Sequence, residues 1–236
     1  MQVYRVIAPV FATNCCIVME GNGEPGSDAV IVDPGAGVAD TVISVVGQRQ
    51  WNVQAVLATH GHVDHTWDAA RLCEEFSVPF RVHAEDAYRI ADPFGTLGAD
   101  TDDAGSLVAQ AVEQGLKALG SAREDYRAPE PLVTFTESGD DGEGNLIAGT
   151  LRIPVIHAPG HTEGASIFQA GGLVLTGDVL FAGAAGRTDL PGGDSLMMVR
   201  SLKKLKGMLD PSLGVVPGHG TTTTVQREID TNPYLV

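Results

Sequence analysis

The chain contains 236 residues, 43% of them hydrophobic and 19% charged, which is enough for one globular domain with a buried core. Its formal net charge of −15 at pH 7 argues against a nucleic-acid or anionic-membrane partner, because phosphate groups are bound by clustered lysine and arginine side chains. We therefore expect a small-molecule substrate, no nucleic acid and no membrane, and a monomer or homodimer.

The cysteines indicate a reducing, cytoplasmic compartment. The chain has three cysteines, Cys15, Cys16 and Cys73. An odd number of cysteines with two of them adjacent does not indicate a disulfide framework. We expect them to be small buried apolar residues, with a vicinal redox pair at Cys15–Cys16 as the alternative. The N-terminal apolar region is interrupted by Arg5 and Asn14, so no signal peptide is expected, and no apolar run is long enough to span a membrane.

The first fifty residues alternate short apolar runs with turns. Residues 3–7, 14–19 and 29–32 are rich in β-branched or small apolar residues, which predicts three strands. The glycine-rich turn at 21–26 is followed by no Gly-Lys-Ser/Thr and is therefore not a phosphate-binding loop. Apolar residues at helical spacing predict a helix over 39–48.

A dense cluster of ligand-type residues follows a predicted buried strand at 53–58. Residues 59–65 read Thr-His-Gly-His-Val-Asp-His. Imidazole nitrogen and carboxylate oxygen both suit zinc, and imidazole also suits iron. A regular helix would spread these offsets around its circumference, so we expect the ligands on a loop before a helix at 67–76. The alternative is a solvated polar loop that holds three histidines without a metal.

The composition changes after a predicted strand at 79–83. From about residue 85 to 131 aspartate, glutamate and alanine are frequent, and apolar residues repeat at three and four positions, which predicts helix. The segment carries no dense ligand cluster, and it is too short for a core of its own. We therefore expect a single domain over residues 1–236 with a mainly helical surface excursion at about 85–131, and we interpret the nearby His83 as structural.

The second half of the chain returns to strands. Strands are predicted within 132–158, interrupted by an acidic turn at 139–145 that we interpret as solvated, with a calcium loop as the alternative. Gly171-Gly172 predicts a hairpin between two further strands. A helix capped by Asp194-Ser195 carries a stripe of Leu196, Val199, Leu202 and Leu205. A last strand is predicted at 213–217, so the fold class is α/β, with sheets packed between helices.

Three further ligand-type residues each follow an apolar run and stand beside glycine, where the backbone can approach another group closely. They are His161, Asp178 and His219. Together with His60, His62, Asp64 and His65 they make seven candidates, which is more than one tetrahedral metal uses. Two metals that share a bridging aspartate would use all seven.

This set of residues resembles the metallo-β-lactamase fold superfamily, and the similarity runs from Met1 to about Leu235. Residues 177–183, 186–189, 217–220 and 232–235 are similar to the glyoxalase II-type hydrolases, in their shorter bacterial variety. The resemblance implies a four-layer αββα sandwich with the site at one edge. It also implies one metal site from His60, His62 and His161, a second from Asp64, His65 and His219, and Asp178 as the bridge.

The sequence departs from the long glyoxalase II enzymes in one respect. Those enzymes have a C-terminal helical region that helps to bind glutathione, and this sequence ends shortly after His219 without it. Arg187 stands near the position where a basic residue of the family contacts the substrate carboxylate. An ion pair between Arg187 and Asp189 is the alternative.

The expected activity is hydrolysis of a small-thiol thioester of the hydroxyacylglutathione type. Two divalent metals, zinc by preference with iron or manganese as alternatives, lower the pKa of a shared water and polarise the carbonyl. We assign catalytic roles to Asp64, which would orient the nucleophile, and to Asp178, which would hold both metals. The thiol leaves as thiolate without much need of a general acid. No Gly-x-Ser-x-Gly elbow supports serine hydrolysis.

Other functions remain open at this point. An iron-dependent persulfide dioxygenase of the same superfamily would use His60, His161 and Asp178. A less specific metallo-hydrolase would use the full ligand set. A true β-lactamase is disfavoured because such enzymes are usually exported, and a nuclease because the basic platform is missing. A metal-binding or partner-binding module that kept the fold is the non-enzyme alternative.

Overall fold

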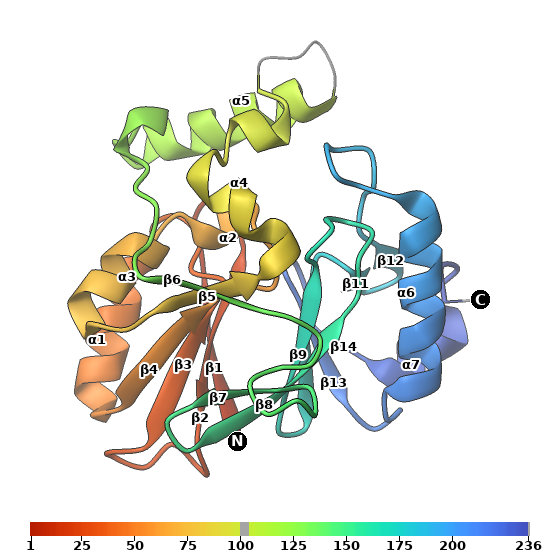
Figure 1. The fold of residues 1–236 in the computed structure, drawn as a ribbon, viewed down its shortest axis with the longest axis horizontal. Helices are drawn as coiled ribbons and strands as arrows, with labels where there is room; N and C mark the ends of the chain where they lie inside the picture. Colours follow the sequence, from red (N-terminus) through yellow and green to blue (C-terminus); the bar gives the residue numbers. More distant parts are fainter. Residues whose placement is uncertain (100–103, 236) are drawn as a thin grey trace.

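Two six-stranded sheets lie face to face between two layers of helices in the computed structural model, which describes residues 1–99 and 104–235. Helices α1 (Ala39–Arg49) and α3 (Ala69–Phe76) cover the outer face of the first sheet, and α6 (Ser195–Met208) and α7 (Val225–Thr231) cover that of the second (Figure 1). This is the expected αββα sandwich.

The first sheet has the order β1–β2–β3–β4–β5–β6. Its first three strands are antiparallel and the rest are parallel. Parallel neighbours need crossover connections, and α1 and α3 supply two of them. The strands are β1 (Gln2–Ile7), β2 (Asn14–Met19), β3 (Asp28–Val32), β4 (Asn52–Leu57), β5 (Phe80–His83) and β6 (Leu132–Phe135).

The second sheet has the order β14–β13–β10–β9–β8–β7. Its β9–β10 hairpin turns at Gly171-Gly172 as expected, and α6 crosses over between the parallel strands β10 and β13. The strands are β7 (Asn145–Ala148), β8 (Leu151–His157), β9 (Ser166–Ala170), β10 (Leu173–Gly177), β13 (Gly214–Pro217) and β14 (Thr223–Thr224), and a separate small hairpin is formed by β11 (Leu180–Phe181) and β12 (Ala184–Ala185).

The hydrophobic core lies in three layers that follow from this arrangement. Residues such as Val30 and Leu57 of the first sheet meet Leu146 and Phe168 of the second sheet in the central layer. The outer layers join each sheet to its helices. The three cysteines are buried and free, as expected, and burial raises the pKa of the Cys16 thiol to about 12.

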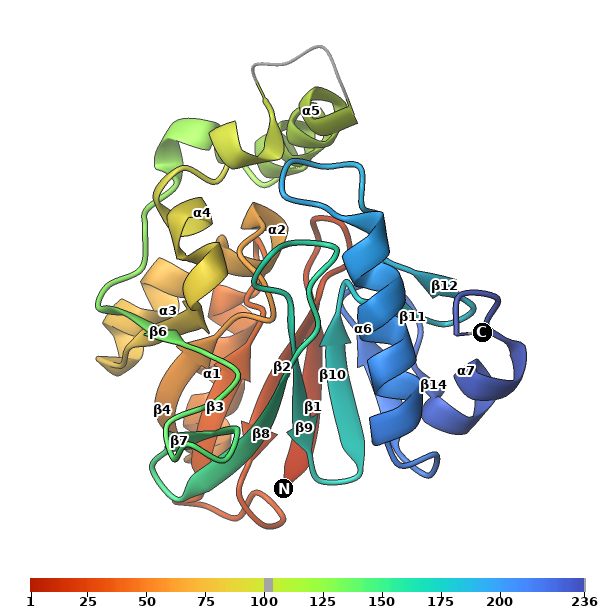
Figure 2. The ribbon, with the colours of Figure 1, turned by 45° about the vertical axis from the view of Figure 1, so that its right-hand side comes forward.

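The excursion is the crossover between β5 and β6. It contains α4 (Ala87–Ala91), α5 (Ala104–Ala118) and the short 3₁₀ turns η1 (Ala84–Asp86), η2 (Gly95–Leu97) and η3 (Arg123–Asp125). Both ribbon views place α5 at one end of the molecule, beyond α4 (Figures 1 and 2). The buried residues Val112 and Leu116 of α5 form a fourth hydrophobic cluster with residues of distant segments such as Val10 and Leu190.

Two expectations about helices are wrong in detail. The ligand motif is not entirely a loop, because the short helix α2 (Val63–Thr66) begins within it, after the extended residue His62. Asp64 thus lies in a first helical turn, where a negative charge is favoured. In α6 the buried face is formed by Met198, Ser201, Leu202 and Leu205, whereas the predicted stripe residues Leu196 and Val199 are 71% and 63% exposed.

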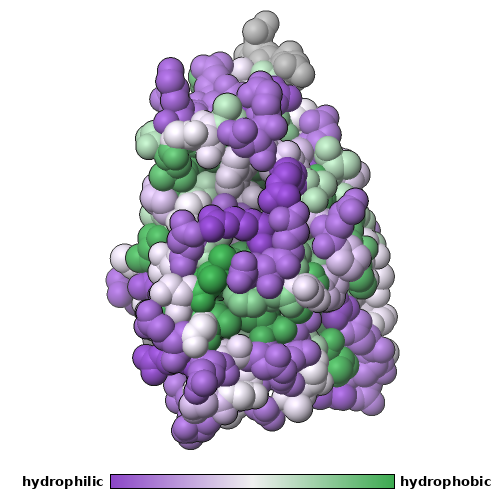
Figure 3. All heavy atoms as spheres, turned by 90° about the vertical axis from the view of Figure 1, so that its left-hand side faces the viewer, coloured by the Kyte–Doolittle hydropathy of each residue, from purple (hydrophilic) through white to green (hydrophobic). Residues whose placement is uncertain are grey.

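The acidic turn at 139–145 forms ion pairs with arginine side chains. The carboxylates of the acidic turn at 139–145 pair with Arg81 and Arg152 instead of converging on one point. On the face that carries α1 and α3, a group of hydrophobic residues lies near the middle among hydrophilic ones (Figure 3). Among the described residues, no helix combines the length and the apolar character needed to cross a membrane.

Candidate metal centre

The structure brings all seven candidate ligands together at one edge of the two sheets. His60 and His62 follow β4, and Asp64 and His65 lie in α2. The other three follow strands of the second sheet whose carboxyl ends share this edge, because β8, β10 and β13 run in the same direction. They are His161 after β8, Asp178 after β10 and His219 after β13.

The first group consists of His60, His62 and His161, all of which are buried. The Nδ1 atom of His62 lies 3.0 Å from Nε2 of His60 and 3.0 Å from Nε2 of His161. Nitrogen ligands at 2.0–2.1 Å from a tetrahedral zinc ion are about 3.3 Å apart. The spacing of these three atoms therefore fits a shared cation.

The second group consists of Asp64, His65 and His219. The two Nε2 atoms are 3.1 Å apart, and Nε2 of His219 lies 3.3 Å from Oδ2 of Asp64. Asp178 lies between the groups: its Oδ2 is 3.6 Å from Nε2 of His161 and 3.4 Å from Nε2 of His219. One carboxylate thus reaches both groups, which is the position of a bridging ligand.

The hydrogen bonds of the imidazoles point their remaining lone pairs into the centre. Nδ1 of His161 donates to the carbonyl oxygen of Arg187 at 2.8 Å, and Nδ1 of His219 donates to that of Phe11 at 3.0 Å. A carbonyl can only accept, so Nδ1 carries the proton and Nε2 is free to ligate. The buried Oδ1 atom of Asp178 has no hydrogen-bond partner among the described residues, which also fits a site for cations.

The carboxylates at the centre favour a protonated His219, whereas burial disfavours protonation of His60 and His62. Burial lowers the pKa of His60 and of His62 well below its usual value. Burial also disfavours charge on His219, but the carboxylates of Asp178 and Asp64 outweigh it and raise the pKa to about 10. The carboxylates therefore require positive charge beside them, which two divalent cations would supply.

Asp33 supports the first ligand loop and was not identified from the sequence. Its carboxylate accepts hydrogen bonds from the backbone N–H of Thr59 at 2.7 Å and from the Thr59 hydroxyl at 2.8 Å. Its Oδ2 also lies 3.1 Å from Nδ1 of His65. The Thr59 oxygen in turn accepts from Nδ1 of His60 at 3.1 Å. Asp33 thereby orients one imidazole of each group.

Asp86 joins the two ligand loops and was also missed. The backbone N–H of Gly61 and the hydroxyl of Thr162 each donate to its Oδ2 at 2.7 Å, and the backbone N–H of Gly164 donates to its Oδ1 at 2.8 Å. The fully buried Arg89 pairs with the same carboxylate at 3.3 Å. Asp86 and Arg89 belong to the excursion, which therefore supports the centre as well as covering the surface.

Two glycines allow this close approach. A Cβ atom at Gly218 would collide with Oδ1 of Asp178, and one at Gly177, where φ is +47°, would collide with the side chain of Thr59. These contacts explain why glycine flanks the ligands after β10 and β13.

Arg187 lies at the centre but its charge is already paired. Its Nε and one terminal nitrogen donate to Asp189 at 2.7 and 2.9 Å, so the ion pair anticipated as the alternative is present. The side chain also lines a cavity of about 310 Å³ that opens onto His62, Asp64 and Asp178. A substrate contact of Arg187 stays a prediction.

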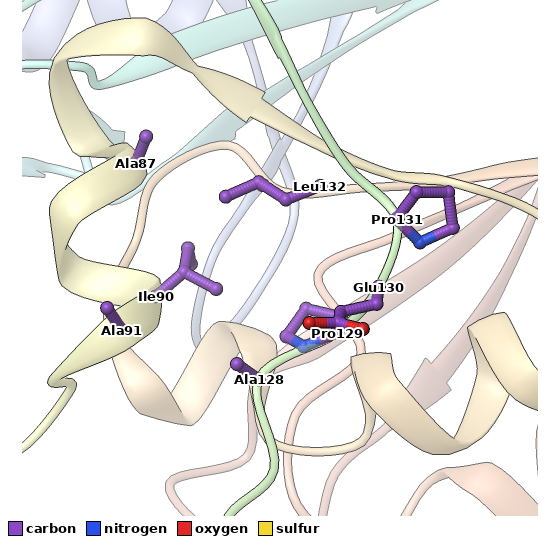
Figure 4. A pocket seen from close by; sticks show the side chains of 8 residues that line it. All are labelled: Ala87, Ile90, Ala91, Ala128, Pro129, Glu130, Pro131 and Leu132. Carbon is purple, nitrogen blue, oxygen red and sulfur yellow. The ribbon is translucent and has the colours of Figure 1, made fainter.

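A larger cavity, of about 600 Å³, lies apart from these ligands, between α4 and residues 128–132 (Figure 4). Alanine, proline, Ile90 and Leu132 form most of its wall, and Glu130 is its one charged residue. Apart from Glu130, none of the described residues in its wall carries a group that could bind a metal or act as a nucleophile.

His83, Glu137 and His157 form another group that could hold a metal, and the sequence did not predict it. The two imidazole rings are stacked, with centroids 4.1 Å apart and an interplanar angle of 12°. Lone pairs in the planes of parallel rings do not converge on one ion. Nδ1 of His83 also accepts a hydrogen bond from the backbone of Glu85, so a structural role for His83, as expected, accounts for its contacts.

Comparison with known proteins identifies the family of this chain. A sequence profile described as the metallo-beta-lactamase superfamily matches residues 10–219. An uncharacterized protein of Mycobacterium tuberculosis is 36% identical over 235 residues, with 97% of this chain and 95% of the relative covered. Hydroxyacylglutathione hydrolase GloC of Haemophilus influenzae is 29% identical, with 100% of this chain and 98% of that protein covered.

Solved structures with the same fold cover nearly the whole chain. The B3 metallo-beta-lactamase BLEG-1 superposes with a TM-score of 0.77 at 27% identity, and each chain is fully covered. The protein TTHA1623, crystallised in a di-iron-bound form, has a TM-score of 0.73 at 29% identity, with 98% of this chain and 100% of that chain covered. Because the profile spans most of the chain and the ligand motif assembles at one edge of the sheets, this protein belongs to the metallo-β-lactamase superfamily of metal-dependent hydrolases.

Proposed function

We propose that the seven residues bind two divalent metal ions and that the protein hydrolyses a thioester of a small thiol, as glyoxalase II-type enzymes do. The observation that carries the proposal is the position of Asp178, whose two oxygens lie 3.4–3.6 Å from nitrogens of both histidine groups. The similarity to a hydroxyacylglutathione hydrolase over the whole chain supports the choice of reaction.

The chemistry divides between the metals and the residues of the chain. Two bound metals supply Lewis acidity, which lowers the pKa of water and polarises a carbonyl group. Asp178 holds the two groups of ligands together, and Asp64, which also lines the cavity, orients the nucleophile beside it. The leaving thiol has a pKa of about 8–9. It can therefore depart as thiolate without being protonated by a general acid.

The ligand types favour zinc, with iron or manganese as alternatives. Imidazole nitrogen suits zinc and iron, and carboxylate oxygen suits manganese as well. The di-iron form of TTHA1623 supports iron as the first alternative. Metal analysis of the protein purified from its own host identifies the ion.

The test is release of free thiol from lactoylglutathione and other thioesters by the metal-loaded protein. We expect about two metal equivalents per chain, thiol release that stops when a chelator removes them, and recovery when they are restored. The variant His83→Gln leaves the metal centre intact and is the control for histidine loss. Thiol release no faster than in the metal-free sample, across several thiol carriers, would reject the proposed reaction.

An iron-dependent persulfide dioxygenase is the second candidate. The close approach of His161 to Asp178, at 3.6 Å, is compatible with an iron site of two histidines and one carboxylate that includes His60. This function would leave Asp64, His65 and His219 without a metal although they are equally well assembled. One iron per chain, with oxygen uptake on a persulfide and no thioester hydrolysis, would favour it.

A further inference from the structure

The cavity at the candidate metal centre is lined by two kinds of residue besides Arg187. Five are candidate ligands, namely His62, Asp64, His161, Asp178 and His219, and four are apolar, namely Phe11, Leu97, Val108 and Leu190, which we call its apolar side. The apolar residues come from four separate segments: the β1–β2 loop, η2, α5 and the loop before α6. The excursion therefore supplies two of the four.

Three of the four apolar residues pack in a hydrophobic cluster of the fold. Leu97 and Leu190 are 1% and 6% exposed and belong, with Val108, to the hydrophobic cluster under α5. Phe11 is 39% exposed, and its backbone oxygen is tied to Nδ1 of His219. Packing within this cluster holds Leu97, Val108 and Leu190 in place, so the cavity offers a preformed apolar surface next to the candidate ligands.

Among the described residues, none on the apolar side of the cavity is suited to bind an anion. Apart from the histidines, Arg187 is the one cationic residue among the described residues that line it, and Asp189 neutralises its guanidinium through two hydrogen bonds. Residues 100–103 and 236, outside the described ranges, include no lysine or arginine. A carboxylate placed against Phe11, Leu97, Val108 and Leu190 would lose its water without gaining a partner.

We propose that Phe11, Leu97, Val108 and Leu190 form a binding subsite for a short, uncharged, apolar group attached to the scissile thioester. The subsite selects such thioesters over those of an anionic thiol such as glutathione. A volume of about 310 Å³ is near the small end for ligand cavities, which limits the group to a short chain. The inference rests on the proposed function and narrows its substrate class.

The apolar group could be on the acyl side or the thiol side of the scissile bond, and two substrate series distinguish them. In one, the acyl chain grows from acetyl to hexanoyl on the neutral thiol N-acetylcysteamine. In the other, the acyl group stays acetyl and the alkyl chain of a neutral thiol grows. We expect kcat/KM of the metal-loaded protein to rise by about fourfold per methylene in one series, and to be at least tenfold lower for the matching glutathione thioester.

The variant Val108→Lys tests the subsite directly, and Leu107→Lys is its matched control. Val108 is partly buried and lines the cavity, whereas the neighbouring Leu107 is 69% exposed and is not part of the wall. A lysine at 108 places an unpaired cation in the cavity, so the preference for the neutral carrier over glutathione should fall by about tenfold or more. The same charge at 107 should change this ratio by less than about twofold.

A second variant and a binding measurement distinguish failure of the subsite from failure of the proposed reaction. Phe11→Ala removes part of the wall without changing the backbone bond to His219, and should reduce the gain per methylene. Calorimetry with non-hydrolysable thioether counterparts measures the same preferences without turnover. If no thioester is hydrolysed but the thioethers show the chain-length and Val108→Lys effects, the subsite stands and the proposed reaction fails.

The subsite is overturned by a different result. Wild-type protein that hydrolyses thioesters with no dependence on chain length, or that prefers the glutathione carrier, contradicts it while leaving the reaction intact. So does a Val108→Lys protein whose carrier preference matches that of Leu107→Lys in a folded, metal-loaded state.

Discussion

Replacing Asp86 by asparagine should weaken both the fold and the metal centre. The Asp86 side chain is fully buried and accepts from Gly61, Thr162 and Gly164 while pairing with Arg89. Asparagine has the same shape but one acceptor oxygen and no charge. Its NH₂ group would face backbone and hydroxyl donors, and Arg89 would lose one of its two carboxylate partners.

The magnitude follows from these contacts. Removing one partner of a buried ion pair costs about 3–5 kcal/mol, and hydrogen bonds to a buried charge contribute about 1.5–3 kcal/mol each. The two figures describe the same carboxylate and are not added. Arg89 also pairs with Glu163 and donates to the carbonyl oxygen of Pro191, so we expect the lower part of the range, about 3 kcal/mol in the free energy of unfolding.

The metal centre should respond as well, because Gly61 lies between two ligands and Thr162 follows a third. Loss of a group that orients metal ligands typically lowers metal affinity by about 10–100-fold. Denaturant unfolding of the metal-free protein measures the first effect, and competition with a chelator measures the second. Asp92→Asn is the control: this exposed excursion residue accepts from Gly95, and its loss should cost less than about 1 kcal/mol.

The reasoning is refuted if Asp86→Asn unfolds like the wild type and binds its metals as tightly. A loss of stability without a change in metal affinity would show that Asp86 supports the fold but does not hold the ligand loops in register.

Three further outcomes are expected. Asp178→Asn should reduce the metal content from about two equivalents per chain to one or fewer, because a neutral amide bridges two cations poorly. It should also lower the rate of thiol release by at least about 100-fold. Metal analysis measures the first effect and the thiol assay measures the second. Arg187→Ala breaks an exposed ion pair and should change the free energy of unfolding by less than about 1 kcal/mol, as denaturant titration would report. Burial raises the pKa of the Cys16 and Cys73 thiols to about 12, so a thiol reagent at pH 8 should label the cysteines only after unfolding; rapid labelling of the native protein would contradict their burial.

Local patterns in the sequence were sufficient to single out the candidate ligands that the structure brings together. His161, Asp178 and His219 stand where predicted strands end beside glycine, and parallel strands bring such positions to one edge. The strands and the β9–β10 hairpin were predictable for the same reason, since alternating or continuous apolar runs and turn residues act over a few positions.

The supporting carboxylates could not be found in this way. The chain has 30 aspartate and glutamate residues. Asp33 directly follows a predicted strand, as Asp178 does, but this position does not distinguish a supporting carboxylate from a ligand, and nothing near Asp86 in the sequence distinguishes it from the other acidic residues. Apart from Arg89, which is three positions from Asp86, the partners described above lie 25 to 78 positions away. A buried carboxylate is defined by the donors that surround it, and those are known only when the segments have packed.

The orientation of α6 and the lining of the cavity also depend on contacts between distant segments. Leu196 and Val199 fit an apolar stripe, yet Met198, Leu202 and Leu205 face the sheet, because several stripes of similar hydrophobicity were available and packing selected one. The residue types and spacings along the chain thus single out the candidate metal ligands and the strands that carry them. Contacts between segments far apart in the chain decide which acidic residues support the candidate ligands and that Val108 of α5 lines the cavity beside them. Local pattern does not encode such contacts.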